Sequence, residues 1–414
     1  MSQAAKRIWV VSELYYPEQT STGYYLTRIA EGLAGTFTTH ALCGQPTYSS
    51  RGVRAPAREI RNGVDVHRVP STTFDKNNLP LRAVNALTLT LAMFMIAVTK
   101  FRAGDAVLVV TNPPLLPFAM RLASALRGAC CVLLVHDVYP DVLVVTGHLR
   151  PSGTRLRVME WLTRRLYRSM SRVVVIGRDM ASRIQARVGA TPMALIPNWA
   201  DLEAVTPIDK RRSPVTVSLG LQEKFIVQYS GNMGRSHGLG VIVEAAAQLA
   251  GDPSIHFLLV GSGAQRHWLE EQVSARGLPN VTIRDPFPRE QLNDVLAACD
   301  IAVVSLESGM AGVSVPSRMY NILAAGRPII AVSDRNSDLA ATVERDRVGW
   351  VVPPGDTHGL VTAILNARRQ GDLMEMGRRA RQVAERDYQY RDVVHAFVRL
   401  FERLALSAEV DRRA

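Results

Sequence analysis

Short apolar runs alternate with longer amphipathic stretches along almost the whole chain. Short runs of aliphatic residues predict buried parallel strands, whereas apolar residues that recur every three or four positions predict helices. Strands that alternate with helices are typical of a doubly wound α/β fold. The strands are expected near 7–12, 39–43, 64–69, 106–111, 131–135 and 173–177 in the first half, and near 224–230, 256–260, 281–285, 301–306, 328–332 and 349–352 in the second.

The two series of strands are separated by a polar stretch at 202–221 that contains Pro207. Proline and polar residues outside a periodic pattern indicate a loop, so this stretch is the predicted linker. Two Rossmann-like domains are therefore expected, 1–205 and 206–389, with a last helix near 390–407 that packs back on the first. Ligands of such sheets bind at the carboxyl ends of the strands, so we expect two ligand edges that face each other across a cleft.

Residues 86–98, ALTLTLAMFMIAV, form a long apolar stretch that is flanked by Arg82, Lys100 and Arg102. The stretch is shorter than the roughly 20 apolar residues that cross a bilayer. A buried or interfacial helix is therefore expected.

Residues 155–172 predict an amphipathic helix that is rich in arginine and contains Trp161 and Tyr167. The pattern is typical of peripheral binding to anionic lipid, but an ordinary helix that packs on the sheet and exposes a basic face also explains it. The two segments together favour peripheral membrane contact. The apolar stripe consists of Leu156, Met159, Leu162, Leu166 and Met170, and the cations are Arg155, Arg157, Arg164, Arg165, Arg168 and Arg172.

The net charge of the chain limits the kinds of binding partner that are expected. The chain has 414 residues and a formal net charge of +12, which favours phosphorylated substrates, an anionic membrane surface or nucleic acid. No zinc spacing, aromatic RNA-binding motif or long basic tail is present, so nucleic acid is not expected as a partner. Four cysteines without metal-ligand spacing, and a start that lacks a signal-peptide pattern, predict a cytoplasmic protein without a bound metal.

The second half places two candidate ligand loops at strand ends. In residues 305–328 an apolar strand is followed by a loop of small residues and then by Ser317 and Arg318, where a helix is expected to begin. A strand end, a flexible loop and a helix N-terminus together make an anion site. Residues 230–238 follow another strand, and their glycines let the backbone approach a ligand beside an arginine and a histidine. Together the two loops predict a cradle for a diphosphate.

The first half offers two further candidates. The backbone amides of Thr22, Gly23 and Tyr24 follow the first strand and are expected to point at a ligand above it, although a plain strand-to-helix turn has the same pattern. His136 and Asp137 follow another strand, at the edge where such sheets bind ligands. A turn histidine that is hydrogen-bonded to Asp137 is the alternative interpretation.

Seven motifs in this order resemble those of one enzyme family over nearly the whole chain. They are YYPEQTSTGYY, HDVYPD, VVVIGRDM, IPNWAD, YSGNMGRSHGL, LLVGSG and SVPSRMYNILAAGRPIIA. The chain resembles the retaining glycosyltransferases of family four, which have the GT-B fold. Within them it is similar to bacterial enzymes that add N-acetyl-fucosamine or related deoxy-amino sugars to lipid-linked O-antigen or capsule precursors.

The resemblance implies a metal-independent transfer without a cofactor, in which the nucleotide sugar is a substrate. It implies that His136 contacts the transferred sugar and that Arg235 and Arg318 stabilise the departing diphosphate, while the donor phosphate takes the acceptor proton. The implied donor-binding residues are Gly231, Asn232, Gly234, His237, Gly261, Gly263, Arg284, Pro286, Val315, Pro316, Ser317 and Asn321. The implied acceptor or phosphate loop consists of Thr22, Gly23, Tyr24 and Asp137.

The sequence departs from the family pattern at the last motif. The family has two glutamates there, and their positions correspond to Val313 and Asn321 in this chain. Asn321 is therefore expected to bind the ribose. The usual arginine and lysine of the family's phosphate loop correspond to Asn232 and His237, so the diphosphate charge is expected to fall on Arg235 and Arg318.

The expected function is transfer of an N-acetylated deoxy-hexosamine from a UDP-sugar to a polyprenyl-diphosphate-linked saccharide, at the inner face of the cell membrane. UDP and GDP are not distinguished by the sequence. A UDP-sugar 2-epimerase with two Rossmann-like halves is one alternative, although it needs acid/base carboxylates in the cleft and no lipid-contact surface. A non-catalytic nucleotide-sugar-binding scaffold is another.

Overall fold

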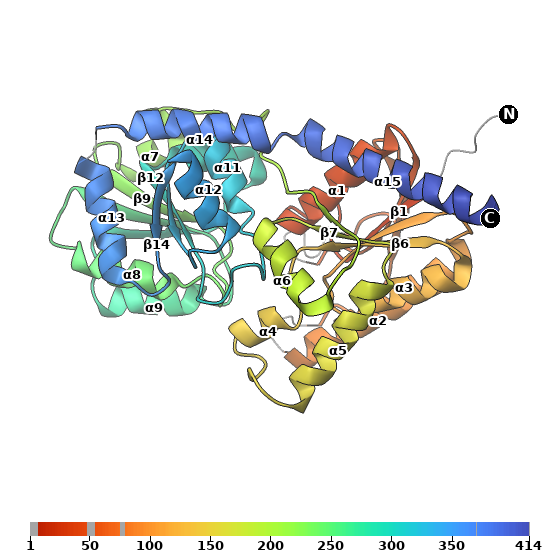
Figure 1. Ribbon diagram of the computed structural model, residues 1–414. Coiled ribbons are helices and arrows are strands. Elements are labelled where there is room, and N and C mark those ends of the chain that lie inside the picture. Colours follow the sequence, from red (N-terminus) through yellow and green to blue (C-terminus); the bar gives the residue numbers. More distant parts are fainter. Residues whose placement is uncertain (1–6, 48–53, 75–78, 370, 414) are drawn as a thin grey trace. The chain divides into compact units, whose positions relative to one another are not determined.

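The computed structural model describes residues 7–47, 54–74, 79–369 and 371–413. The chain forms two compact units, each built on its own sheet (Figure 1). The predicted α/β class with two Rossmann-like halves is confirmed. Of the described residues, those within 1–141, 150–197 and 391–414 form the first unit, and those within 142–149 and 198–390 form the second.

The first unit contains an eight-stranded sheet in the order β3-β4-β2-β1-β5-β6-β7-β8. Neighbouring strands run parallel except at the edge, where β3 and β4 are antiparallel. The central strands are buried runs of aliphatic residues, as expected where helices cover both faces. The strands are β1 (Arg7–Ser12), β2 (Thr38–Gly44), β3 (Arg58–Arg61), β4 (Val64–Val69), β5 (Ala106–Val110), β6 (Cys130–Val135), β7 (Arg172–Val175) and β8 (Met193–Leu195).

Helices cover both faces of this first sheet (Figure 1). One face carries α1 (Ser21–Ala34) and the last helix, α15 (Tyr390–Arg413), where the ring of Phe401 meets that of Phe37 with centroids 6.4 Å apart. The other face carries a row of helices that pack against their neighbours. These are α2 (Leu79–Lys100), α3 (Leu116–Arg127), α5 (Thr154–Ser169) and α6 (Arg178–Val188). The short α4 (Asp141–Val145) precedes α5 in the chain, and all of it except Asp141 belongs to the second unit.

The apolar stretch predicted at 86–98 is part of a longer helix. Helix α2 has 22 residues. It begins before the predicted stretch, since Pro80 occupies the first turn, where proline is tolerated, and it continues through Lys100. The expectation that this helix is too short to cross a bilayer is therefore wrong. Within the described residues, 80–100 is the one helical segment that is long and apolar enough to do so by length and composition, and it packs on the sheet.

The second unit contains six parallel strands in the order β11-β10-β9-β12-β13-β14. Helices α8, α9 and α13 pack together on one face, and α11, α12 and α14 pack together on the other. The strands are β9 (Phe225–Ser230), β10 (Ile255–Val260), β11 (Val281–Arg284), β12 (Ile301–Ser305), β13 (Ile329–Val332) and β14 (Gly349–Val352). The helices are η1 (Lys210–Arg212), α7 (Pro214–Leu219), α8 (Leu239–Gln248), α9 (Arg266–Ala275), η2 (Arg289–Gln291), α10 (Leu292–Ala297), α11 (Arg318–Ala324), α12 (Asp338–Asp346), α13 (Thr357–Arg369) and α14 (Leu373–Asp387).

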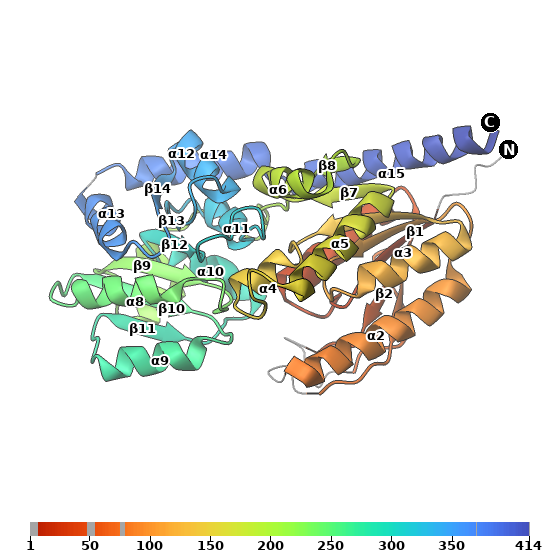
Figure 2. The ribbon, with the colours of Figure 1, turned by 60° about the horizontal axis from the view of Figure 1, so that its bottom comes forward.

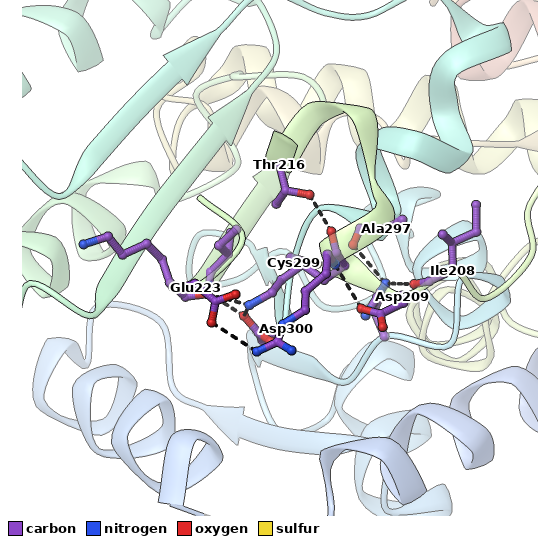
Figure 3. A network of polar contacts seen from close by, with 12 residues as sticks. Ile208, Asp209, Thr216, Glu223, Ala297, Cys299 and Asp300 are labelled. Atoms are coloured by element: carbon purple, nitrogen blue, oxygen red, sulfur yellow. Dashed lines mark hydrogen bonds and ion pairs between the residues drawn. The ribbon is translucent and has the colours of Figure 1, made fainter. Parts of the chain in front are cut away.

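The predicted linker at 202–221 is wrong, because this stretch is part of the second unit. The Lys210 ammonium lies 2.6 Å from the Asp300 carboxylate, and Arg327 donates hydrogen bonds to the carbonyls of Ile208 and Ala297 (Figure 3). The polar residues that suggested a loop thus make ion pairs and caps within a folded segment.

The boundary between the units accordingly falls after Pro197 rather than after residue 205. Val205 is fully buried, and the Ala200 backbone N–H donates to the Tyr388 carbonyl at 2.9 Å. These contacts attach the start of the segment to the second unit before the predicted boundary is reached.

Candidate functional site

The two predicted loops of the second unit meet through Arg318, the first residue of α11. Its guanidinium carbon lies 4.5 Å from the centroid of the Tyr229 ring, and its Nη2 donates to the Asn232 carbonyl at 3.4 Å. Gly231 leaves room for this arrangement, since a Cβ there would stand 3.2 Å from the Arg318 guanidinium carbon. Arg318 therefore reaches from one loop across the other, at the carboxyl end of β9.

The Arg318 guanidinium is the strongest mark of an anion site. Its Nη1 is buried and has no hydrogen-bond partner, and no carboxylate of the described residues pairs with it. A buried donor of a cation that has no acceptor and no counter-charge is costly unless a ligand supplies them. Planar guanidinium groups bind phosphate oxygens with two hydrogen bonds at once.

His237 supplies a neutral group beside this cation. Burial, and then the positive charge of Arg318, lower the pKa of His237 to about 3. Its Nδ1 lies 3.3 Å from the Gly234 carbonyl. Because the imidazole is neutral at pH 7, His237 can contribute hydrogen bonds but not charge. The remaining predicted cation, Arg235, is exposed at the tip of the loop.

The loops after β9 and β10 are held together by their backbones. Met233 donates to the Ser262 carbonyl at 2.8 Å, and Gln265 donates to the Met233 carbonyl at 2.9 Å. Gly263 has a φ of +150°, and a Cβ there would stand 2.6 Å from the Met233 carbonyl. This glycine, which the sequence associated with a ligand, therefore has a packing reason as well.

The nearby end of β11 borders the same edge. The carbonyl of Arg284 accepts hydrogen bonds from the Gly261 N–H at 3.0 Å and from the Arg266 Nη1 at 2.7 Å. Arg266, which sequence reasoning missed, also donates to the Gly261 carbonyl at 2.7 Å and so clamps the two loops. The side chains of Arg284 and Pro286 are exposed there.

The loop of small residues after β12 is anchored by Asp334, a second residue that sequence reasoning missed. Its Oδ2 accepts the backbone N–H groups of Gly309 at 2.9 Å and Ala311 at 3.2 Å. These two amides already have an acceptor within the protein, so they are not the anion site that the sequence suggested. The signal was present, because an aspartate lies two residues past the end of β13 at this edge.

The start of α11 departs from the predicted cap. Ser317 occupies the N-cap position with helical φ and ψ, and its side chain does not cap the helix. Val315 is buried before it, and the Pro316 carbonyl accepts from the Met319 N–H at 3.1 Å. The orienting feature at this helix start is therefore the Arg318 side chain rather than a serine cap.

The two positions that correspond to the family's glutamates have different surroundings. Val313 is fully buried, so a carboxylate is not tolerated there without rearrangement. Asn321 accepts the backbone N–H of Asp201 through Oδ1 at 2.9 Å, and Arg289 holds the Asp201 carboxylate. The Asn321 Oδ1 is therefore occupied within the protein, which leaves the amide nitrogen as the group that can contact a ligand.

In the first unit, the predicted amide site at the start of α1 is largely occupied. Thr20 caps the helix and accepts from the Gly23 N–H at 3.3 Å through its side chain, and from the Tyr24 N–H at 2.9 Å through its carbonyl. Thr22 is half-buried in the first turn. Two of the three predicted amides thus have partners within the helix cap, which matches the plain-turn interpretation.

His136 follows β6 and is buried. Burial lowers its pKa to about 4, so the imidazole is neutral at pH 7. The backbone N–H groups of His136 and Asp137 both donate to Thr111 Oγ1 at 3.2 Å. The Nε2 atom has no partner, which is the property expected of a group that hydrogen-bonds a ligand. His136 belongs to the first unit, whereas Arg235 and Arg318 belong to the second.

One cluster in the first unit has metal-ligand types. His40 Nδ1 and His67 Nε2 lie 3.3 and 3.1 Å from Asp65 Oδ2. Arg58 donates to both carboxylate oxygens at 2.9 and 2.8 Å, and these hydrogen bonds are the main reason that the pKa of Asp65 is lowered to about 2. Because Arg58 of β3 already occupies the carboxylate, the cluster is a polar network across β2, β3 and β4 in which Arg58 and Asp65 form the ion pair.

Two doubly wound units, with glycine loops and a half-buried arginine at the carboxyl edge of the second, are the architecture of GT-B glycosyltransferases. Residues 224–369 match the family model described as "Glycosyl transferases group 1", and residues 21–199 match "Glycosyl transferase 4-like domain". The chain belongs to this glycosyltransferase family and is a glycosyltransferase.

Relatives and solved structures agree with this assignment. The "Probable glycosyltransferase WbjE" of Pseudomonas aeruginosa is 31% identical over 92% of this chain and 94% of its own. The "Putative colanic acid biosynthesis glycosyl transferase WcaI" of Escherichia coli is 29% identical over 67% and 69%. Sucrose-phosphate synthase from Thermosynechococcus elongatus has the same fold, with a TM-score of 0.78 at 19% identity over 97% and 100%. The structure of Anabaena HepE in complex with UDP also has this fold, with a TM-score of 0.70 at 15% identity over 96% of this chain and 99% of its own.

Proposed function

We propose that the protein is a retaining glycosyltransferase of cell-surface polysaccharide biosynthesis. It transfers an N-acetylated deoxy-hexosamine from a UDP-sugar to a polyprenyl-diphosphate-linked saccharide at the inner face of the cell membrane. The name of the WcaI relative, which refers to colanic acid, supports the polysaccharide. The HepE structures with UDP and UDP-glucose support the donor.

The observation that carries the proposal is the half-buried Arg318 guanidinium, whose buried Nη1 has neither a hydrogen-bond partner nor a counter-charge. As the bond between the sugar and the diphosphate breaks, negative charge grows on the diphosphate. A fixed cation stabilises that charge more in the transition state than in the ground state. Arg235 adds charge from the exposed loop tip, and neutral His237 contributes a hydrogen bond.

His136 hydrogen-bonds the transferred sugar through its free Nε2. A neutral imidazole suits this role, because a second cation would oppose the positive charge that develops at the anomeric carbon. Asn321 contacts the ribose through its amide nitrogen. The acceptor hydroxyl attacks on the face that the diphosphate leaves, and a phosphate oxygen of the donor takes its proton, so the configuration is retained without a covalent nucleophile.

The test is transfer from UDP-N-acetyl-amino sugars to polyprenyl-diphosphate-linked saccharides, with the anomeric configuration of the product read by NMR. Arg318→Ala should abolish transfer and the stabilisation of the protein by UDP, whereas Arg276→Ala should change neither, since Arg276 is an exposed partner of Glu244 in the same unit. A 2-epimerase would instead form an epimer without acceptor. A scaffold would bind UDP without turnover, and full activity of Arg318→Ala would contradict the site.

A further inference from the structure

The outward sides of three helices in the first unit carry many exposed apolar side chains. Helices α2, α3 and α5 lie side by side on one face of the sheet (Figure 2). Each turns one side to the sheet, so their opposite sides point the same way. Nine of the eighteen large apolar side chains that are exposed in the described residues lie here. These nine, Val84, Leu87, Leu91, Met95, Leu122, Leu126, Val158, Trp161 and Leu162, form what we call the three-helix face.

Helix α2 supplies a continuous stripe of this face. Leu87, Leu91 and Met95 follow one another at four-residue spacing and are 57%, 60% and 57% exposed. On its other side, Met93 and Ala97 are fully buried. The helix is thus apolar on both sides while the fold covers only one, and such a stripe indicates a second apolar environment.

Helix α5 adds positive charge. Arg155, Arg157 and Arg164 are exposed, and none of them forms an ion pair within the described part of the chain. Arg165 lies over the ring of Trp161, with 4.4 Å between the guanidinium carbon and the ring centroid. An exposed tryptophan among unpaired arginines matches the headgroup region of an anionic bilayer.

The stripe that the sequence predicted on this helix is divided between two roles. Leu166 and Met170 are buried, so the end of that stripe packs inward, as in the ordinary-helix interpretation. Leu162 of the same stripe is exposed and, like Val158 and Trp161, lies among the arginines of α5.

We propose that the three-helix face docks on the surface of a bilayer that contains anionic lipids. The apolar stripe of α2 enters the boundary between headgroups and acyl chains, and the arginines of α5 contact lipid phosphates. Because the opposite side of α2 belongs to the core, the helix lies in the membrane plane and does not cross it. The proposal adds to the proposed function the surface that brings the site to a lipid-linked acceptor. It rests on the proposed function for the reason why the protein docks, and on the exposed side chains for the docking itself.

The test is sedimentation of the full-length protein with vesicles of phosphatidylcholine, with and without phosphatidylglycerol. Binding is expected to the anionic vesicles, and high salt should release much of it. Leu91→Asp should weaken binding at least about tenfold, through lost apolar burial and an added negative charge. Arg157→Ala should weaken it about fivefold. Val217→Asp is the matched control, since Val217 is 52% exposed in the second unit, and it should bind like the unmodified protein.

Three results would overturn the proposal. They are an unmodified protein that stays in solution with anionic vesicles, a Leu91→Asp variant that binds as tightly as Val217→Asp, and a dimer in solution that Leu91→Asp dissociates. The last would show that a second copy covers the face. Transfer to a water-soluble acceptor analogue, measured on the same variants, separates a failure of this proposal from a failure of the proposed function.

Discussion

The guanidinium of Arg318 stacks over the ring of Tyr229, and the hydroxyl of that same tyrosine donates to the Asn232 carbonyl at 2.6 Å. Arg318 Nη2 donates to the same carbonyl. One buried aromatic residue at the end of β9 therefore positions both the loop and the cation that reaches across it. The ring positions the Arg318 guanidinium, and the hydroxyl positions the loop through the Asn232 carbonyl.

These two roles of Tyr229 can be separated by substitution. Tyr229→Phe keeps the ring under Arg318 and removes the hydrogen bond, so we expect a loss of about 1 kcal/mol in the free energy of unfolding with UDP affinity nearly unchanged. Tyr229→Leu also removes the cation–π contact, which is worth about 1–2 kcal/mol when desolvated, and UDP affinity should fall. Urea unfolding and isothermal titration calorimetry measure the two effects. Equal UDP affinities in the two variants would show that the ring does not position Arg318.

Gly263 is predicted to be intolerant of any side chain. Gly263→Ala places a Cβ 2.6 Å from the Met233 backbone, so the β9 and β10 loops must separate. We expect a loss of at least about 2 kcal/mol of stability, or weakened UDP binding if the loops move instead. Gly277→Ala is the control, because Gly277 also has positive φ but a Cβ there has open space. Its cost should be about 1 kcal/mol, from backbone strain alone. Equal losses in thermal unfolding would mean that the contact does not matter.

His136 should make stability depend on pH. Its pKa in the folded protein, about 4, lies below the unfolded value, so the unfolded chain binds a proton first as the pH falls. The stabilising contribution is therefore complete above about pH 6.5 and is lost as the pH falls towards 4. Between pH 7 and pH 5 the loss from this group amounts to about 2 kcal/mol. His136→Asn should show a shallower pH dependence of unfolding than the unmodified protein. Parallel profiles would mean that His136 is not buried as a neutral group.

Asp334 is expected to order the loop after β12. Asp334→Ala leaves the Gly309 and Ala311 amides without this acceptor, and their hydrogen exchange should accelerate, with a loss of about 1–3 kcal/mol in the free energy of local opening. Asp334→Asn keeps one acceptor oxygen, so the exchange rates of the two amides should lie between those in Asp334→Ala and those in the unmodified protein. Unchanged exchange in Asp334→Ala would show that other contacts hold the loop.

Much of the fold followed from the pattern of apolar residues. The strands Arg7–Ser12, Val64–Val69 and Gly349–Val352 have the predicted bounds, and the other predicted strands differ by only a few residues at their ends. Buried parallel strands are recognisable because both faces require aliphatic side chains, so the local pattern carries the whole signal. The segment at 202–221 was misjudged because its polar groups are satisfied by distant partners, such as Asp300 for Lys210.

The sequence by itself determined the class of fold, the family and the two loops that carry Gly231 and Arg318. These properties depend on residues close together in the chain. Only the tertiary structure decided that Arg318 lies over Tyr229, that Asp334 holds the loop before it, and that α2 keeps an uncovered stripe. The first two are contacts between residues that are distant in the sequence, and the third depends on which side of one helix is buried and which is exposed. Charge pairing and burial are properties of neighbours in space, and a linear pattern does not specify which neighbours meet.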